Sequence, residues 1–221
     1  MEPGHRPLIP VVGKVRQTAQ TSACASNLRQ IGVALATYSA DNRNGLPGYD
    51  PVTDQYNTSY GLNRAAGAIF YTQGGKPTRD LCSHLGRYLS VEVGGLSVGQ
   101  GLIPPFVCPA NPNAASRTAP GTSYYIATSV RMNDGTLRRA IGYNNATVAA
   151  EKRSVKRTDI SNPSTAVALF DADNDFLTLL SIANVTDAST NAVHGSIRNV
   201  LYFDGHVSAV PYTTNPQEKA L

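Results

Sequence analysis

Residues 11–44 read VVGKVRQTAQTSACASNLRQIGVALATYSADNRN, and their pattern decides the fold. From Cys24 onward the larger apolar residues recur at steps of four and three, which places them on one face of a helix. The larger apolar residues assigned to this pattern are Val12, Val15, Ala19, Cys24, Leu28, Ile31, Leu35 and Tyr38. Neither glycine nor proline interrupts the run between Gly32 and Gly45. We therefore expect one long amphipathic helix.

A dense stop signal follows this helix. Residues 41–47 read DNRNGLP, with Gly45 placed for a left-handed cap and Pro47 just beyond it. A helix of this extent is about 50 Å long at about 1.5 Å per residue, whereas a small domain is about 30 Å across. We therefore expect one end of the helix to protrude or to be covered by another molecule.

The composition bounds the size and class of the protein. The chain has 221 residues, of which 41% are hydrophobic, and this suits one well-buried domain, or one domain with a large insertion, better than two independent cores. Charged residues make up 15%, below the usual level of about 25%. Asn, Ser, Thr, Gly and Tyr make up the difference. Such a composition is typical of a loop-rich exported protein that contains β-structure.

The formal charge of +4 raises the question of a nucleic-acid partner. The basic residues are scattered in short pairs, such as Arg138-Arg139 and Lys152-Arg153, without the interleaved aromatic residues of a single-strand binder. We expect a solvated basic surface and no nucleic-acid partner.

The chain divides into four segments within one domain, 1–221. The helix covers about 8–44, and residues 45–104 form a loop-rich insertion with short helical patterns at 63–71 and 78–89. A proline-bounded passage at 104–109 predicts an extended segment or short strand. Runs of aromatic and β-branched residues then predict strands within 105–212, followed by a tail at 213–221. These runs lie at 123–131, 137–143, 165–170, 199–203 and 206–212.

Two turn signals connect strands in this region. Asn133-Asp134-Gly135 predicts a hairpin between its flanking runs. Asp204-Gly205 predicts a two-residue connection of type I′, whose positive φ values suit Asp and Gly.

Three cysteines leave one unpaired in any intramolecular scheme. Cys24 lies on the apolar helix face, so its simplest role is that of a small buried hydrophobic residue. Cys82 and Cys108 are the pair that an oxidising compartment would join. Their separation in space does not follow from the sequence, so this pairing stays open.

Two motifs resemble a known family. Residues 8–16 and 24–32, LIPVVGKVR and CASNLRQIG, resemble the second half of the N-terminal helix of prepilin-like proteins of the type II secretion pseudopilin type. His194, a nine-residue gap and Asp204-Gly205 within NVLYFDGHV resemble the C-terminal signature of prepilin-processing-associated proteins.

The resemblance implies an α+β fold that is pilin-like, with the long N-terminal α-helix packed on an antiparallel β-sheet. It also implies a structural subunit of a type II secretion or type IV pilus-like assembly, in contact with other pilin-like subunits and secretion-system components. The helix face is expected to pack partly on the sheet and, toward its N-terminal end, on neighbouring subunits. The residues assigned to this face are Val12, Val15, Leu28, Ile31 and Leu35.

The resemblance also bears on location. In the family, a membrane-spanning helix half with a leader and a cleavage glycine precedes the segment found here. Residues 1–10 lack these features, so we expect membrane contact only through an N-terminal helix half that this chain lacks. The expected location is the periplasmic or extracellular face of the cell envelope, with inner-membrane anchoring in a full-length form.

Asp171-Ala-Asp173-Asn-Asp175 is the best candidate for a cation site. Three carboxylates at alternate positions suit Ca²⁺, and the related major pseudopilins bind calcium in a loop. The segment departs from the calcium-loop pattern at Phe176, where glycine is required, and at Ile182, where glutamate is required. A plain acidic turn is the alternative, and we expect no other cofactor.

Catalytic motifs are lacking: the sequence has no G-x-S-x-G, H-E-x-x-H, Walker or dinucleotide pattern. His194 and His206 are candidates for metal ligation or proton transfer. A hydrogen bond to a neighbouring loop is the commoner role of such a histidine. A hydrolase using His194 and Asp204 is the least favoured hypothesis, and we expect a protein that is not an enzyme.

An extracellular binding module on a pilin-like stem, for example for carbohydrate, is the alternative function. Its contact surface would be a group of tyrosines in the part of the chain that the resemblance does not cover. These are Tyr49, Tyr56, Tyr60 and Tyr71.

Overall fold

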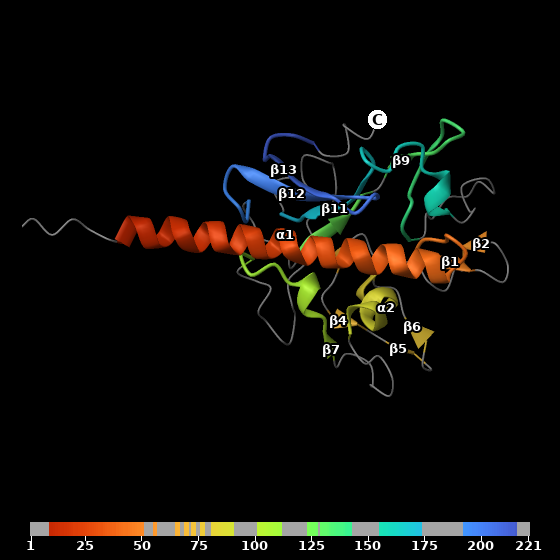
Figure 1. Cartoon of the computed structure of the whole chain (residues 1–221), viewed down its shortest axis with the longest axis horizontal. Coiled ribbons are helices and arrows are strands. Elements are labelled where there is room, and N and C mark those ends of the chain that lie inside the picture. The colour runs from red at the N-terminus through yellow and green to blue at the C-terminus, as the bar shows by residue number, and fades with distance from the viewer. Residues whose placement is uncertain are drawn as a thin grey trace, which may run out of the picture.

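A computed structural model describes residues 9–50, 55–56, 65–66, 69–70, 72–73, 76–77, 81–90, 101–111, 123–127, 129–142, 155–173 and 192–215. Within these ranges the chain forms one long N-terminal helix, α1, and an antiparallel sheet of five strands (Figure 1). The α+β class expected from the sequence is confirmed at this level.

Helix α1 spans Ile9–Asp41, close to the predicted range. Its capping differs from the prediction. Arg43 and Asn44 have positive φ values of 54° and 65°, and the Asn44 backbone N–H donates to Ser39 O at 2.8 Å. Gly45 instead forms a bridge with Lys156. The predicted Gly45 cap is wrong because the chain enters this extended pairing directly after the helix.

The sheet has the strand order β13, β12, β11, β8, β3, and each neighbouring pair is antiparallel. The strands are β13 Val207–Pro211, β12 Ile197–Tyr202, β11 Val167–Asp171, β8 Tyr124–Ile126 and β3 Ala65–Ala66. All residues of β11 are buried, which explains its continuous apolar run, since a strand covered on both faces has no polar side. The predicted strands at 165–170, 199–203 and 206–212 are confirmed.

The core lies between α1 and the sheet. It joins Leu28 and Ile31 of the helix to Leu169 of β11 and Leu201 of β12. A second buried cluster, which includes Phe170 and Val200, lies among residues of β8, β11, β12 and β13. Adjacent strand residues therefore belong to different clusters, as the twofold alternation of a strand requires.

Helix α1 and the hairpin of β12 and β13 approach each other closely at Gly32. A Cβ atom on Gly32 would lie 2.9 Å from Leu201 Cδ1 and 3.5 Å from the backbone of Gly205. Only glycine permits this approach without a shift of the core.

Shorter elements complete the described chain. They are β1 Tyr49–Asp50, β2 Gln55–Tyr56, β4 Ile69–Phe70, β5 Thr72–Gln73, β6 Lys76–Pro77, α2 Leu81–Leu85, η2 Gly86–Leu89, β7 Gly101–Leu102, η3 Pro104–Phe106, β9 Val130–Arg131, β10 Leu137–Arg138 and η5 Arg157–Asp159. Two predictions fail here. The helical pattern at 63–71 belongs to β3 and β4, and the expected extended passage at 104–109 begins with a 3₁₀ turn, for which its prolines set φ.

Both predicted hairpins form, with three-residue loops. The Gly205 N–H donates to Tyr202 O at 3.0 Å, and the Tyr202 N–H donates to His206 O at 3.0 Å. Gly205 has a φ of 96°, whereas the φ of Asp204 is not positive. The predicted type I′ turn is therefore wrong: this is a turn closed by a left-handed glycine. Gly135, with a φ of 78°, closes the hairpin of β9 and β10 in the same way.

Candidate functional site

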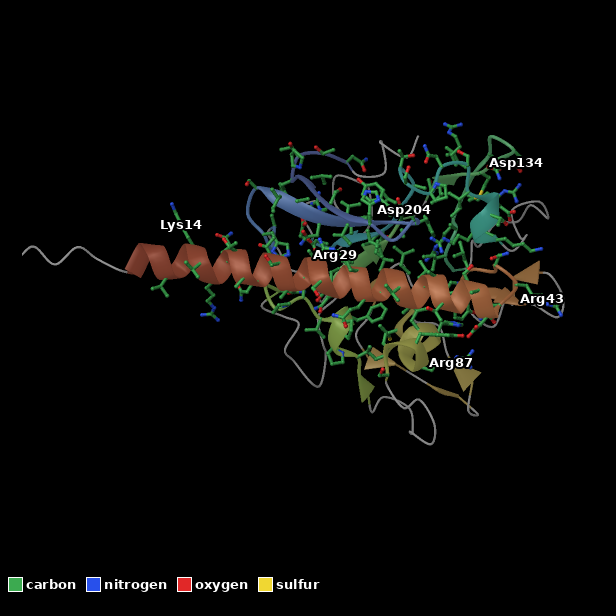
Figure 2. All side chains as sticks on the ribbon, in the orientation of Figure 1. Lys14, Arg29, Arg43, Arg87, Asp134 and Asp204 are labelled. Atoms are coloured by element: carbon green, nitrogen blue, oxygen red, sulfur yellow. A yellow bond between two sulfur atoms is a disulfide. The ribbon has the colours of Figure 1, made fainter. Side chains whose placement is uncertain are left out.

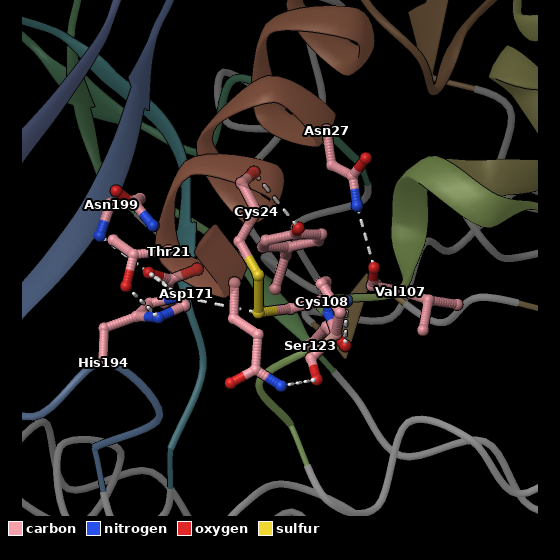
Figure 3. Close-up of a disulfide and its surroundings, with 12 residues drawn as sticks. Thr21, Cys24, Asn27, Val107, Cys108, Ser123, Asp171, His194 and Asn199 are labelled. Atoms are coloured by element: carbon pink, nitrogen blue, oxygen red, sulfur yellow. Dashed lines mark hydrogen bonds and ion pairs between the residues drawn. A yellow bond between two sulfur atoms is a disulfide. The ribbon is translucent and has the colours of Figure 1, made fainter. Parts of the chain in front are cut away.

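A disulfide between Cys24 and Cys108 joins the middle of α1 to the segment after η3 (Figure 3). The two Cα atoms are 5.0 Å apart and both side chains are fully buried. The expectation that Cys24 is only a small buried hydrophobic residue is therefore wrong, and the pairing of Cys82 with Cys108 that was left open does not form. Cys82 is buried and takes no part in this disulfide. The two cysteines are 84 residues apart in sequence, so only the tertiary fold brings them close enough to pair.

Two hydrogen bonds flank the disulfide. Asn27 Nδ2 donates to Val107 O at 2.8 Å, and Gln20 Nε2 donates to Pro109 O at 3.1 Å. Residues 107–109 are called the strap. The disulfide and the two hydrogen bonds fix the helix to this strap at three successive helical turns.

His194 and Asp171 lie against this disulfide. His194 Nε2 is 3.5 Å from Cys108 Sγ and 3.4 Å from Asp171 Oδ2. His194 Nδ1 lies 3.1 Å from Thr21 Oγ1 of the helix. Asp171 Oδ2 also accepts a hydrogen bond from the backbone N–H of Asn199 at 2.7 Å. Four segments, α1, the strap, β11 and the turn before β12, therefore meet in one buried polar group.

Burial dominates the electrostatics of this group. Burial raises the pKa of Asp171 to about 7, with the Asn199 N–H and the Arg198 charge opposing the shift. Burial lowers the pKa of His194 to about 4. The imidazole is therefore neutral at pH 7, which leaves one ring nitrogen with a lone pair.

A second buried cluster surrounds Asp173. Arg198 Nη2 donates to Asp173 Oδ2 at 2.9 Å, and the Tyr212 hydroxyl donates to Asp173 Oδ1 at 3.0 Å. Arg198 also donates to Tyr212 O at 3.0 Å and lies over the Tyr212 ring. Arg198 is 1% exposed, so its charge is compensated by this carboxylate and not by water.

Of the acidic residues predicted to form a calcium loop, Asp171 lies in the sheet and Asp173 lies two residues beyond it. Asp171 ends β11, and both Asp171 and Asp173 are buried. They face different partners, since one lies beside His194 and the other is bonded to Arg198. Asp175 lies outside the described residues. Calcium binding by the three carboxylates stays a prediction.

The C-terminal signature has a structural explanation. His194 lies against Thr21 at one end of β12, and Gly205 lies against Gly32 at the other. Thr21 and Gly32 are about 16 Å apart along the helix at about 1.5 Å per residue. The six residues of β12 span about 20 Å at about 3.3 Å each. The nine-residue gap therefore matches the length of strand that runs along α1 between two contact points.

Asp204 and His206 form a separate surface pair. His206 Nδ1 is 2.6 Å from Asp204 Oδ1, and the His206 ring stacks on Tyr202 with centroids 4.2 Å apart. Slight burial raises the pKa of Asp204. The hydrogen bonds from the His206 backbone and ring lower it by more, so the pKa lies below its usual value. His194 and Asp204 lie at opposite ends of β12, so the structure does not bring the hypothetical hydrolase pair together.

The five residues predicted to share one helix face divide into two sets. Leu28, Ile31 and Leu35 are buried against the sheet side of the chain, whereas Val12 and Val15 are 65% and 64% exposed. At about 100° per residue, Val15 lies about 140° around the helix axis from Leu28. The prediction of one common face is therefore wrong. Toward the N-terminus, the line of the packed face continues with polar residues, the exposed Gln17 and the half-buried Gln20.

Val12 and Val15 belong to an exposed stripe that runs along the whole helix. Its members recur at steps of three and four and are all exposed. This outer stripe consists of Val12, Val15, Ala19, Ser22, Ser26, Arg29, Val33, Thr37 and Ala40. Val33 is 67% exposed although it lies where α1 covers the sheet. Figures 1 and 2 show α1 extending beyond the sheet at its N-terminal end, where Lys14 lies.

Sequence reasoning missed the contacts of Thr21, Cys108 and Arg198. The available signal was that Cys24 and His194 each lie within one of the two motifs.

The tyrosine side chains of the alternative binding module, at 49, 56, 60 and 71, lie outside the described part. No helix within the described ranges combines the length and apolar character needed to cross a bilayer. No protein-family model, curated relative or solved structure matches the chain.

Proposed function

We propose that this chain is a non-enzymatic structural subunit of a pilin-like assembly in the cell envelope, of the type II secretion or type IV pilus kind. Its partners are other pilin-like subunits, which pack along α1. The observation that carries the proposal is the exposed outer stripe on a helix that extends beyond its own domain.

The chemistry of the outer stripe suits packing against another helix. Seven of its nine residues are Val, Ala or Ser, and Arg29 is its one charged member. Apolar or small residues at steps of three and four form the seam of helix bundles, because they allow two helix axes to approach to about 8–10 Å. Two valines at the projecting end supply apolar area that the monomer leaves in water.

The disulfide and its flanking hydrogen bonds support the same proposal. A helix that transmits force or register between subunits must leave its domain in a fixed direction. Cys24, Asn27 and Gln20 fix α1 to the strap at the point where the helix passes beyond the sheet. The projecting part is thereby held by a covalent bond and not by apolar packing alone.

The relation between the two sequence motifs adds support. Residues 24–32 of the helix include Cys24 and Gly32. In the C-terminal motif, His194 lies against the Cys24–Cys108 disulfide and Leu201 lies against Gly32. The two motifs are therefore one packing unit, which supports a helix-on-sheet module of the pilin-like kind.

A matched pair of substitutions tests the proposal. Val15→Glu places a charge on the outer stripe, and Gln17→Glu adds the same charge at an exposed position about 160° away on the helix surface. Each variant is produced in the native cells, and its distribution between monomer and high-mass envelope assemblies is measured by sedimentation. We expect Val15→Glu to shift the protein to monomer and Gln17→Glu to behave as wild type. Equal distributions for all three proteins would refute the assembly role of the stripe.

A further inference from the structure

The group around the disulfide contains the atoms of a metal site. One sulfur atom each from Cys24 and Cys108 and one ring nitrogen of His194 all lie within 4.8 Å of one another. Asp171 Oδ2 lies 3.4 Å from the same ring nitrogen. Figure 3 shows these side chains converging from α1, the strap, β11 and the turn before β12.

The spacing suits a tetrahedral ion. With bonds of about 2.3 Å to sulfur and about 2.0 Å to nitrogen or oxygen, neighbouring ligands of zinc lie about 3.3–3.8 Å apart. The contacts of His194 Nε2 with Cys108 Sγ and with Asp171 Oδ2, at 3.5 Å and 3.4 Å, fall in this range. Two thiolates, an imidazole and a carboxylate are a donor set that zinc accepts.

The surrounding groups already orient these ligands. Thr21 Oγ1 lies 3.1 Å from His194 Nδ1, and a partner on this nitrogen directs Nε2 toward the ion. The Asn199 N–H holds Asp171 Oδ2 in place. Asp171 Oδ1 is buried and has no hydrogen-bond partner among the described residues. A buried carboxylate oxygen without a partner is costly, and a bound cation would remove that cost.

We propose that reduction of the Cys24–Cys108 disulfide converts this group into a zinc site with Cys24, Cys108, His194 and Asp171 as ligands. A dithiol reductant supplies two electrons and two protons, breaks the sulfur–sulfur bond and is itself oxidised to a disulfide. Zinc then replaces the two thiol protons, which pass to solvent. In the reverse step a small-molecule disulfide accepts two electrons from the thiolates and two protons from solvent and becomes a dithiol, while the Cys24–Cys108 bond reforms and the ion is released. This inference concerns a different part of the chain from the outer stripe and does not depend on the proposed assembly.

Metal binding to the full chain in its two redox states tests the inference. The protein is reduced with a phosphine, desalted under argon and titrated with Co²⁺ and then with Zn²⁺. We expect one ion per reduced chain, with the thiolate charge-transfer bands of tetrahedral Co²⁺, which Zn²⁺ displaces. We expect no such bands from the disulfide form.

Matched variants assign the ligands. Cys108→Ser and His194→Gln are expected to weaken zinc binding by more than about tenfold, since changes even to outer-shell groups cost that much. Asp171→Asn tests the fourth ligand and should alter the Co²⁺ spectrum. Cys82→Ser removes a buried thiol outside the group and should bind zinc as wild type does.

Four outcomes overturn the inference. The first is a reduced chain that binds no zinc. The second is binding that survives Cys108→Ser or His194→Gln unchanged, and the third is binding that is lost in Cys82→Ser. The fourth concerns folding. Circular dichroism accompanies each titration. If reduction unfolds the chain, Zn²⁺ is expected to restore the helical signal, because binding to a site present only in the folded state drives folding; failure to restore it also overturns the inference.

Discussion

Removal of the disulfide should cost this chain a large share of its stability. Cys24 and Cys108 are 84 residues apart in sequence. In the chain-entropy model a closed loop of about 84 residues restricts the unfolded state by about 4.5 kcal/mol at 25 °C. Typical domains are stable by about 5–15 kcal/mol. We therefore expect Cys24→Ala/Cys108→Ala to lower the free energy of unfolding by about 4 kcal/mol.

Equilibrium unfolding in urea at neutral pH measures this change. The wild-type chain in its disulfide form is compared with the double variant and with Cys82→Ala, which removes a buried thiol but no cross-link. The double variant should also show a larger dependence of stability on urea, because its unfolded state is less compact and exposes more surface.

A loss below about 1 kcal/mol in the double variant would refute the entropic reasoning, since the predicted restriction is several times larger. A loss in Cys82→Ala as large as that in the double variant would also refute it, because ordinary cavity formation would then account for the effect.

Three further predictions concern packing and buried charge. Gly32→Ala should leave the chain about 1–3 kcal/mol less stable than Gly13→Ala in urea unfolding, because both gain helix propensity but only Gly32 meets a core side chain. Burial lowers the pKa of His84 from 6.5 to about 4. Between pH 6.5 and pH 4 the unfolded chain therefore binds a proton at His84 that the folded chain does not bind. The free energy of unfolding accordingly falls as the pH drops through this range. His84→Phe should reduce the difference in the free energy of unfolding between pH 7 and pH 4 by up to about 3 kcal/mol, as measured by unfolding curves at the two pH values. Arg198→Met should cost about 3–5 kcal/mol by thermal unfolding, because it leaves the buried Asp173 carboxylate without its guanidinium; a neutral effect would refute this reasoning.

The elements with strong local patterns could be predicted from the sequence. Helix α1 follows from the spacing of Leu28, Ile31 and Leu35, and β11 to β13 follow from apolar runs separated by turn residues. The failures occur where local pattern and tertiary context disagree. Within the helical pattern at 63–71, residues 65–66 pair with strand β8 and residues 69–70 pair with strand β7, so both pairs of residues form strands.

The buried site could be predicted only in part. His194 stood out through its motif, but its partners are distant in sequence: Thr21 lies on the helix, Cys108 on the strap and Asp171 on β11. Proximity between such segments depends on the packing of the whole core. The prediction of one helix face was wrong for a different reason. The apolar spacing is regular from Cys24 onward, but at 3.6 residues per turn Val12 and Val15 lie on another side of the helix.

Site-specific photo-cross-linking tests the central claim, that the outer stripe packs on neighbouring subunits. A photoreactive phenylalanine analogue is placed at Val15, or at Gln17 as the control, in the full chain within the native cells, and the adducts are identified by mass spectrometry. The account predicts adducts from position 15 to the helix of a pilin-like subunit or of a second copy of this chain, and few from position 17. Adducts of equal yield from both positions, or none from position 15, would contradict it.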